Sequence, residues 1–212
     1  MNLFRNSNHF IPYGKQNISK ADIASVISVL KSNFITQGPL IEEFENEVAR
    51  KTFSKYGIST NSATSALHIA CLALGLKSGD TLWTSSNSFV ASSNCALYCG
   101  AYVDFVDIDI YTGLMSIDSL KEKLESAKKN NKLPKIVIPV HFAGSSCDMK
   151  EIYNLSRKFG FLIIEDASHA IGGSYHKHPI GSCKYSDITV FSFHPVKIIT
   201  TGEGGMATTN NQ

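Results

Sequence analysis

The chain has 212 residues, with 20 Lys and Arg against 18 Asp and Glu, and 43% of its residues are hydrophobic. These values are ordinary for a globular protein with a sizeable core, and the interspersed charges argue against a nucleic-acid or membrane-surface partner. Residues 1–16 lack the apolar core of a signal peptide, and no stretch reaches the roughly 18 apolar residues of a membrane span. We therefore expect a cytoplasmic protein whose partner is a small molecule.

The five cysteines indicate neither a disulfide framework nor a metal site. They are odd in number, form no CxxC pair, and have no histidine at ligand spacing. Reduced, mostly buried thiols fit this pattern best, and no metal is expected.

Two helices and a strand are predicted at the start of the chain. Ser19 is a helix cap with Asp22 three residues later, and apolar residues then recur at helical spacing up to Lys31. A turn at Gly38 and Pro39 precedes a second helix over 40–53. A strand over 56–60 then leads to a long apolar helix that ends near Leu76.

That long helix begins with small polar residues. Its first backbone N–H groups lack partners within the helix, and the helix dipole favours negative charge there, so Ala63, Thr64 and Ser65 are candidates for a phosphate site. Thr64 and Ser65 are equally good capping residues, and this stretch alone does not separate the two interpretations.

Strands and helices alternate through the middle of the chain. Strands are predicted over 81–85, 101–109 and 135–140, and helices over 86–98, 116–129 and 148–159. This alternation predicts an α/β fold, with a mostly parallel sheet covered by helices on both faces. Phe89, near a helix start, either packs in the core or offers a ring for stacking, and His141 follows a strand, where it either approaches the site or bonds to backbone.

Residues 161–166 form a short apolar strand that ends in two acids. Asp166 would then lie where a parallel strand opens onto a ligand crevice, and a carboxylate there needs a cationic partner. The protonated ring nitrogen of pyridoxal phosphate is such a partner.

A second apolar strand, over 188–193, is followed by Pro195 and Lys197. Because Val196, Ile198 and Ile199 flank the lysine, we expect its ammonium form to lose hydration, which lowers the pKa and favours the neutral amine that Schiff-base chemistry requires. The alternative is a surface lysine just past a strand end.

Several ordered motifs resemble one known family. IIEDASHAIGG and FSFHPVKIITTGEGGM, together with TQGP and NSATSALHIACLALGL, are similar to the pyridoxal-phosphate sugar aminotransferases of the DegT/DnrJ/EryC1/StrS group. The resemblance runs from Ile11 onward. It is strongest to the UDP-4-amino-4,6-dideoxy-N-acetyl-beta-L-altrosamine transaminases, which aminate a UDP-linked 4-keto-6-deoxy sugar on the way to pseudaminic acid and surface polysaccharide.

The resemblance implies a fold type I transferase whose cofactor is pyridoxal 5′-phosphate. Residues 1–212 would be its large, cofactor-binding domain, with helices 19–53 contributing to the substrate pocket. Relatives continue into a smaller C-terminal domain, so the chain is expected to be truncated. A nucleotide-linked keto sugar, glutamate as amino donor and a homodimer in the full-length form are implied as partners.

The resemblance also implies roles for individual residues. Lys197 would hold the cofactor and move protons, and Asp166 would keep the ring nitrogen protonated. The remaining cofactor-binding residues would be Ala63, Thr64, Ser65, Phe89, His169 and Ser192. The substrate-binding residues would be Tyr13, Thr36, Gln37 and Gly38.

Other interpretations stay open at this point. A sugar dehydratase of the same group has histidine in place of the lysine, and Lys197 argues against it. A Rossmann enzyme needs GxGxxG after its first strand, and the glycines here are not so placed. A non-catalytic fragment, or another nucleotide-sugar aminotransferase of the same family, is not separated by the sequence.

Overall fold

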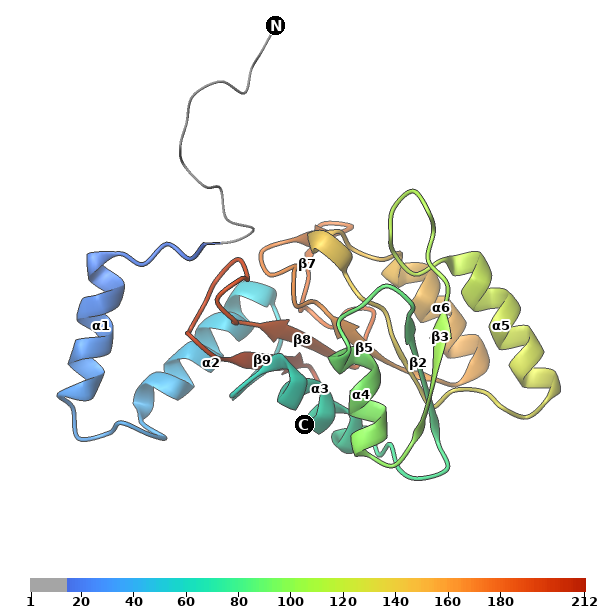
Figure 1. The fold of residues 1–212 in the computed structure, drawn as a ribbon, viewed down its shortest axis with the longest axis horizontal. Coiled ribbons are helices and arrows are strands. Elements are labelled where there is room, and N and C mark those ends of the chain that lie inside the picture. Colours follow the sequence, from blue (N-terminus) through green and yellow to red (C-terminus); the bar gives the residue numbers. More distant parts are fainter. Residues whose placement is uncertain (1–14) are drawn as a thin grey trace, which may run out of the picture.

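The structure is a computed structural model that describes residues 15–212, and its centre is a seven-stranded sheet (Figure 1). The strand order is β1-β9-β8-β5-β4-β2-β3, and β9 is the one strand of this sheet that runs antiparallel to its neighbours. The strands are β1 (Tyr56–Thr60), β2 (Thr81–Ser85), β3 (Tyr102–Val106), β4 (Ile136–Ile138), β5 (Leu162–Asp166), β8 (Ile188–Ser192) and β9 (Gly205–Thr209). The expected α/β class with a mostly parallel sheet is confirmed.

Six α-helices accompany the sheet in the described part of the chain. They are α1 (Lys20–Leu30), α2 (Pro39–Thr52), α3 (Ala63–Ala73), α4 (Ala91–Tyr98), α5 (Ile117–Lys129) and α6 (Met149–Phe159). A short 3₁₀ turn, η1 (Phe142–Gly144), and a hairpin of β6 (Ser174–Tyr175) and β7 (His178–Pro179) complete the elements. None of these helices is long and apolar enough to cross a membrane.

The helices cover both faces of the sheet. On one face α3 and α4 pack on the strands through small residues such as Ala66, Ala70 and Ala96, which let the helix backbones approach closely. On the other face α5 and α6 pack on Trp83 and Val137, and α2 packs next to them through Val48. This two-sided burial is why the strand sequences are continuous apolar runs rather than alternating ones.

Alternation along β5 gives its two acids different environments. Ile163 belongs to the cluster under α5 and α6, whereas Ile164 belongs to the cluster under α3 and α4. Since successive side chains of a strand point to opposite faces, Glu165 faces the α6 side and Asp166 faces the α4 side. Glu165 and Asp166, the two acids that end β5, therefore lie on opposite faces of the sheet.

Several expected elements differ in length from those observed. The helix expected over 86–98 begins only at Ala91, and the strand expected over 135–140 covers Ile136–Ile138. The helix expected to reach Leu76 ends at Ala73, because Gly75 adopts a φ of +73° and redirects the chain into β2. The strand expected over 101–109 stops at Val106, where the Asp107 side chain accepts the N–H of Ile108 and begins a turn. The β6–β7 hairpin was not predicted, since two-residue strands carry no periodic signal.

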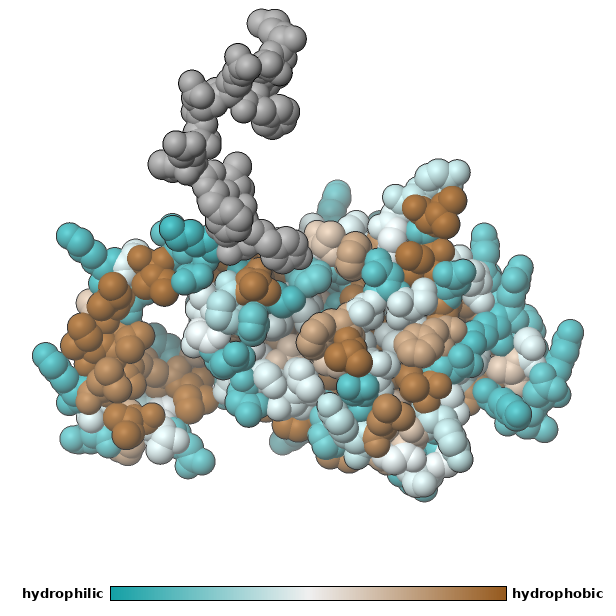
Figure 2. Space-filling view, viewed as in Figure 1, coloured by the Kyte–Doolittle hydropathy of each residue, from teal (hydrophilic) through white to brown (hydrophobic). Residues whose placement is uncertain are grey.

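Helix α1 stands apart from the rest of the fold (Figure 1). It has a full capping box between Ser19 and Asp22 but no buried residue. Figure 2 shows apolar side chains gathered at this end of the molecule. Ile23 and Leu30 on this helix are both more than half exposed. Its apolar face thus makes no core contact within the described residues.

Candidate active site

A cavity of about 370 Å³ lies at the carboxyl ends of β5 and β8, the edge at which open α/β sheets bind ligands. Strand ends, the start of α3, the segment before α4 and the loop after β8 all contribute to its wall. Seven of the residues expected at the cofactor site line it: Ala63, Thr64, Phe89, Asp166, His169, Ser192 and Lys197. Residues more than 130 positions apart in sequence therefore meet in one cavity.

The start of α3 offers free backbone donors to this cavity. Ser62 is the cap, and its hydroxyl accepts the N–H of Ser65 at 3.2 Å. The N–H groups of Ala63 and Thr64 have no hydrogen-bond partner among the described residues. This is the arrangement in which a helix start binds an anion.

Ser65 does not line the cavity. Its hydroxyl donates to the side chain of Asn61 at 2.6 Å, and its backbone N–H is taken by Ser62. Ser62 lies in the cavity wall in its place. The position of the Ser65 side chain therefore does not support the expectation that Ser65 helps to form the phosphate site, because its N–H and hydroxyl already bond to Ser62 and Asn61.

Gly205 brings β9 against the start of α3. A Cβ placed on it would lie 2.4 Å from the backbone nitrogen of Ala63 and 2.4 Å from the carbonyl carbon of Ser62. Backbone atoms cannot yield as a flexible side chain can, so only glycine permits this approach. The packing of β9 thus sets where the free N–H groups of α3 lie.

Asp166 is held by three hydrogen-bond donors and is only 3% exposed. The hydroxyl of Ser92, on α4, donates to Oδ2 at 2.6 Å. The hydroxyl and the N–H of Ser168 donate to Oδ1 at 2.6 and 3.1 Å. Neither serine was identified from the sequence, since only the packing of α4 over the sheet brings Ser92 to the carboxylate.

Lys197 lies in a loop that is closed at its base by backbone bonds between the ends of β8 and β9. Phe193 donates to the carbonyl of Gly204 at 2.9 Å, and its own carbonyl accepts the N–H of Thr201 at 3.1 Å. Burial lowers the pKa of the Lys197 ammonium, and the nearby Asp166 carboxylate partly opposes this shift. A lowered pKa increases the neutral, nucleophilic fraction of the amine.

The expected cause of the lowered pKa is confirmed in part. Burial lowers the pKa of Lys197, as expected, and Val196 lines the same cavity as the lysine. Ile198 and Ile199 are each at least half exposed and are not part of that cavity wall. The burial therefore comes from the cavity as a whole and not from the flanking apolar residues alone.

Two rings flank the cavity. Phe89 is 72% exposed, which excludes the interpretation that it packs in the core. His169 lies edge-on to Phe142, with ring centroids 6.4 Å apart. Burial lowers the pKa of His169, as does the charge of Lys197, while Asp166 opposes them. His169 is therefore favoured in its neutral form beside the lysine.

A buried polar cluster supports β4 and β5 from the opposite face. Nε2 of His141 lies 2.7 Å from Oε2 of Glu165, and Nδ1 of the same ring accepts the N–H of Cys147 at 3.2 Å. Because Nδ1 is an acceptor, Nε2 carries the proton and donates to Glu165. The expected alternatives for His141 are thus both realised: it reaches the cavity wall and bonds to backbone.

The expected substrate residues are not brought into this cavity. Thr36, Gln37 and Gly38 lie in the exposed turn between α1 and α2 and are absent from the cavity wall. Tyr13 lies outside the described residues. The structure of this chain therefore brings together the expected cofactor residues but not the expected substrate residues.

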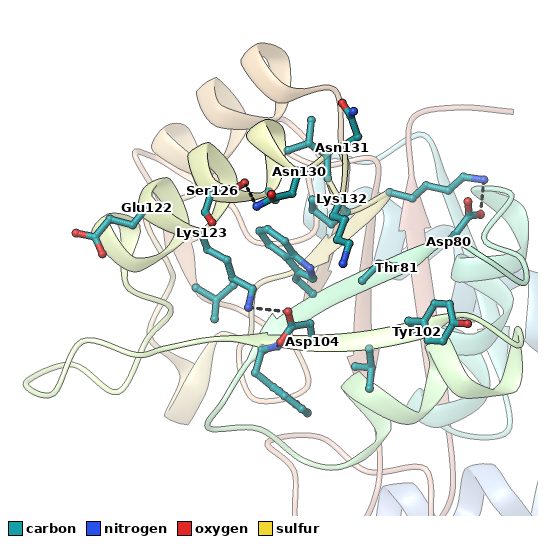
Figure 3. A pocket seen from close by; sticks show the side chains of 18 of the residues that line it. Asp80, Thr81, Tyr102, Asp104, Glu122, Lys123, Ser126, Asn130, Asn131 and Lys132 are labelled. Carbon is teal, nitrogen blue, oxygen red and sulfur yellow. Dashed lines mark hydrogen bonds and ion pairs between the residues drawn. The ribbon is translucent and has the colours of Figure 1, made fainter.

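A larger cavity, about 1100 Å³, lies elsewhere, between β3 and α5 (Figure 3). Two of its three lysines are already paired: Lys123 binds Asp104 at 2.7 Å and Lys135 binds Asp80 at 2.9 Å. It is an open groove that contains none of the expected site residues. Size alone therefore does not locate the active site here.

Known proteins resemble this chain over most of its length. A UDP-4-amino-4,6-dideoxy-N-acetyl-beta-L-altrosamine transaminase of Campylobacter jejuni is 41% identical over 202 residues, which cover 95% of this chain and 52% of that protein. The structure of Helicobacter pylori PseC, described as an aminotransferase involved in the biosynthesis of pseudoaminic acid, matches with a TM-score of 0.86 and 32% identity, covering 95% of this chain and 52% of that one.

A third match is the PLP form of the putative sugar aminotransferase Spr1654 from Streptococcus pneumoniae, with a TM-score of 0.85 and 30% identity over 96% of this chain and 54% of that one. The chain spans about half the length of the curated relatives it matches. The family model of the DegT/DnrJ/EryC1/StrS aminotransferases matches residues 16–212. The chain thus belongs to the DegT/DnrJ/EryC1/StrS aminotransferase family.

Proposed function

We propose that this chain supplies the cofactor-binding part of a pyridoxal-phosphate-dependent aminotransferase that acts on a nucleotide-linked 4-keto-6-deoxy sugar. The observation that carries the proposal is the meeting, in one cavity, of the Lys197 amine, the Asp166 carboxylate and the free N–H groups at the start of α3. An amine, an anionic acceptor and an anion site are the three groups that pyridoxal phosphate needs.

The cavity residues fit this cofactor in detail. The N–H groups of Ala63 and Thr64, with the hydroxyl of Ser192, suit its phosphate. The exposed ring of Phe89 suits stacking on a pyridine. Asp166 is buried and held rigidly, as a partner for a protonated ring nitrogen must be.

When bound, the cofactor supplies an electron sink that stabilises negative charge next to the amino group being transferred. The protein residues do the rest. Lys197 binds the cofactor through its Nζ and afterwards takes and returns a proton as base and acid, a role that its lowered pKa favours. Asp166 stabilises positive charge on the cofactor ring. His169 lies near Lys197 and Asp166, and its lowered pKa favours the neutral form, which does not add a second positive charge there.

The substrate class rests on the relatives. Those compared above include an altrosamine transaminase and an enzyme of pseudoaminic acid biosynthesis, and another is called a UDP-4-amino-4-deoxy-L-arabinose–oxoglutarate aminotransferase. These names support a UDP-linked N-acetylhexosamine with a 4-keto group as substrate and glutamate as amino donor. The proposal also includes a role in surface polysaccharide synthesis and a cytoplasmic location. Within this proposal, helices 19–53 and a second subunit complete the sugar pocket.

The test combines cofactor titration with a product assay. We expect pyridoxal phosphate to develop a visible absorbance band with the wild-type chain that the free cofactor lacks, and Lys197→Ala to abolish this band. With glutamate and a UDP-4-keto sugar, mass spectrometry should detect the amino sugar with wild type only. Failure of the wild-type chain to bind the cofactor would refute the proposal, whereas binding without turnover would favour a non-catalytic cofactor-binding protein.

A further inference from the structure

Three buried or half-buried polar side chains, Ser88, Ser92 and Asp166, form a hydrogen-bonded row next to the cavity. Ser88 lies before α4, and Ser92 lies one helical turn later, on the same side as the carboxylate. Their hydroxyl oxygens are 2.7 Å apart, and Ser92 Oγ is 2.6 Å from Asp166 Oδ2. Ser92 is fully buried. Ser88 has no role among those assigned above, and Ser92 has so far been described only as one of the donors that hold Asp166.

The direction of each hydrogen bond follows from proton count. An ionised carboxylate only accepts, so Ser92 must donate its single hydroxyl proton to Asp166. The bond between the serines therefore has Ser88 as donor and Ser92 as acceptor, and the Ser88 hydroxyl shares its proton with the carbonyl of Phe89 at 3.1 Å. Both hydrogen bonds point toward the carboxylate, and such chains strengthen each member because each donor is polarised by the next.

The same count shows what remains free on Asp166. A carboxylate has about four acceptor positions. Ser168 occupies two with its hydroxyl and N–H, both at Oδ1, and Ser92 occupies a third at Oδ2. The fourth position is on Oδ2, the oxygen held by Ser92, and Asp166 lines the cavity.

We propose that Ser92, supported by Ser88, is a positioning residue that fixes the Asp166 carboxylate so that its last free acceptor position on Oδ2 meets the ring nitrogen of the cofactor. The inference rests on the proposed function. Ser92 acts through Asp166 and touches no cofactor atom itself, since it is not part of the cavity wall. Without it, Oδ2 would have one buried donor fewer and the carboxylate would be free to rotate.

The test removes the hydroxyl and the ring nitrogen separately. Binding of pyridoxal phosphate is compared by calorimetry with binding of its 1-deaza analogue, in which a carbon replaces the ring nitrogen. Because a hydrogen bond to an ionised group is worth about a tenfold change or more, we expect Ser92→Ala to weaken binding of pyridoxal phosphate by about tenfold. Binding of the deaza analogue should change by less than about twofold.

Two further variants separate the hydrogen bond from packing. Ser92→Cys keeps the volume but has only a weak S–H donor, so it should behave like Ser92→Ala. Ser93→Ala is the matched control on the same helix, since its hydroxyl bonds only to the carbonyl of Val90, at 2.9 Å, and it should leave both affinities unchanged. Urea denaturation of each variant verifies that it is folded.

The outcomes distinguish the inference from the function on which it rests. An equal loss for both ligands in Ser92→Ala would show a merely structural role and overturn the inference, as would no loss for either. Wild-type binding of pyridoxal phosphate combined with either result would leave the proposed function standing. Failure of the wild-type chain to bind pyridoxal phosphate would overturn both.

Discussion

Replacing Glu165 should destabilise the fold strongly although this residue lies outside the cavity. Glu165 is 5% exposed and accepts from Nε2 of His141 at 2.7 Å, from Thr189 at 3.0 Å and from Ser186. In Glu165→Ala these three donors lose their acceptor in a dry environment. Removing one partner of a buried pair costs about 3–5 kcal/mol, because the desolvated remaining groups stay unpaired.

The measurement is equilibrium urea unfolding followed by the fluorescence of Trp83, the single tryptophan, which is buried between the sheet and α5. Glu165→Ala should lower the free energy of unfolding by about 3–5 kcal/mol. Glu122, exposed on α5, is the matched control, and Glu122→Ala should change it by less than about 0.5 kcal/mol. A loss below about 1 kcal/mol for Glu165→Ala would refute the argument.

The same residue predicts a pH dependence. Burial by itself raises the pKa of Glu165, but the bonds from His141, Ser186 and Thr189 outweigh burial and hold the pKa below its ordinary value of 4.5. A carboxyl with a lowered folded pKa contributes stability above its unfolded pKa and loses it as the pH falls through the folded value. The difference in unfolding free energy between wild type and Glu165→Gln should therefore shrink below about pH 4.5.

Three further predictions concern single residues. Asp166→Asn should lower the transamination rate at least about a hundredfold, because an amide cannot balance the charge of a protonated ring nitrogen. The free energy of unfolding in urea should fall by no more than about 2 kcal/mol. An unimpaired rate would show that another group holds the ring proton. Gly205→Ala should cost about 1–3 kcal/mol and weaken cofactor binding, since its Cβ would meet the backbone of Ala63 and Ser62; unchanged affinity in titration would contradict the close packing. Asp104→Ala should promote self-association in analytical ultracentrifugation, and Asp118→Ala is the control. The Asp104 carboxylate accepts the N–H of Phe105 at 2.8 Å on the sheet-edge strand β3 and binds Lys123 (Figure 3), so it blocks pairing of this edge with another strand. A monomeric Asp104→Ala protein would show that the edge does not need this protection.

The sequence predicts the sheet and the positions of Asp166 and Lys197 well, for identifiable reasons. Apolar runs such as Ile188 to Ser192 are long enough to indicate buried strands, and parallel strands place their carboxyl ends at one edge. A polar residue at or shortly after the end of such a strand is therefore expected at a ligand crevice. Asp166 is the last residue of β5, and Lys197 lies in the loop that follows β8.

Other parts of the site depend on contacts that local sequence does not encode. Ser92 and Asp166 are 74 positions apart in sequence, and only the packing of α4 over the sheet creates their contact. Ser65 is absent from the cavity wall because its N–H bonds to Ser62 and its hydroxyl bonds to Asn61 at the helix cap. The burial of Lys197 likewise comes from the cavity as a whole, and most residues of that cavity are distant from Lys197 in sequence.

The central claim is that Lys197 is the residue that binds the cofactor. The most direct measurement is borohydride reduction of the chain incubated with pyridoxal phosphate, followed by peptide mapping. Lys197 lines the cavity, and burial lowers its pKa. We therefore predict a pyridoxyl group on Lys197 and none on the exposed Lys177 and Lys184. A modification found on Lys177 or Lys184 instead, with Lys197 unmodified, would contradict the account.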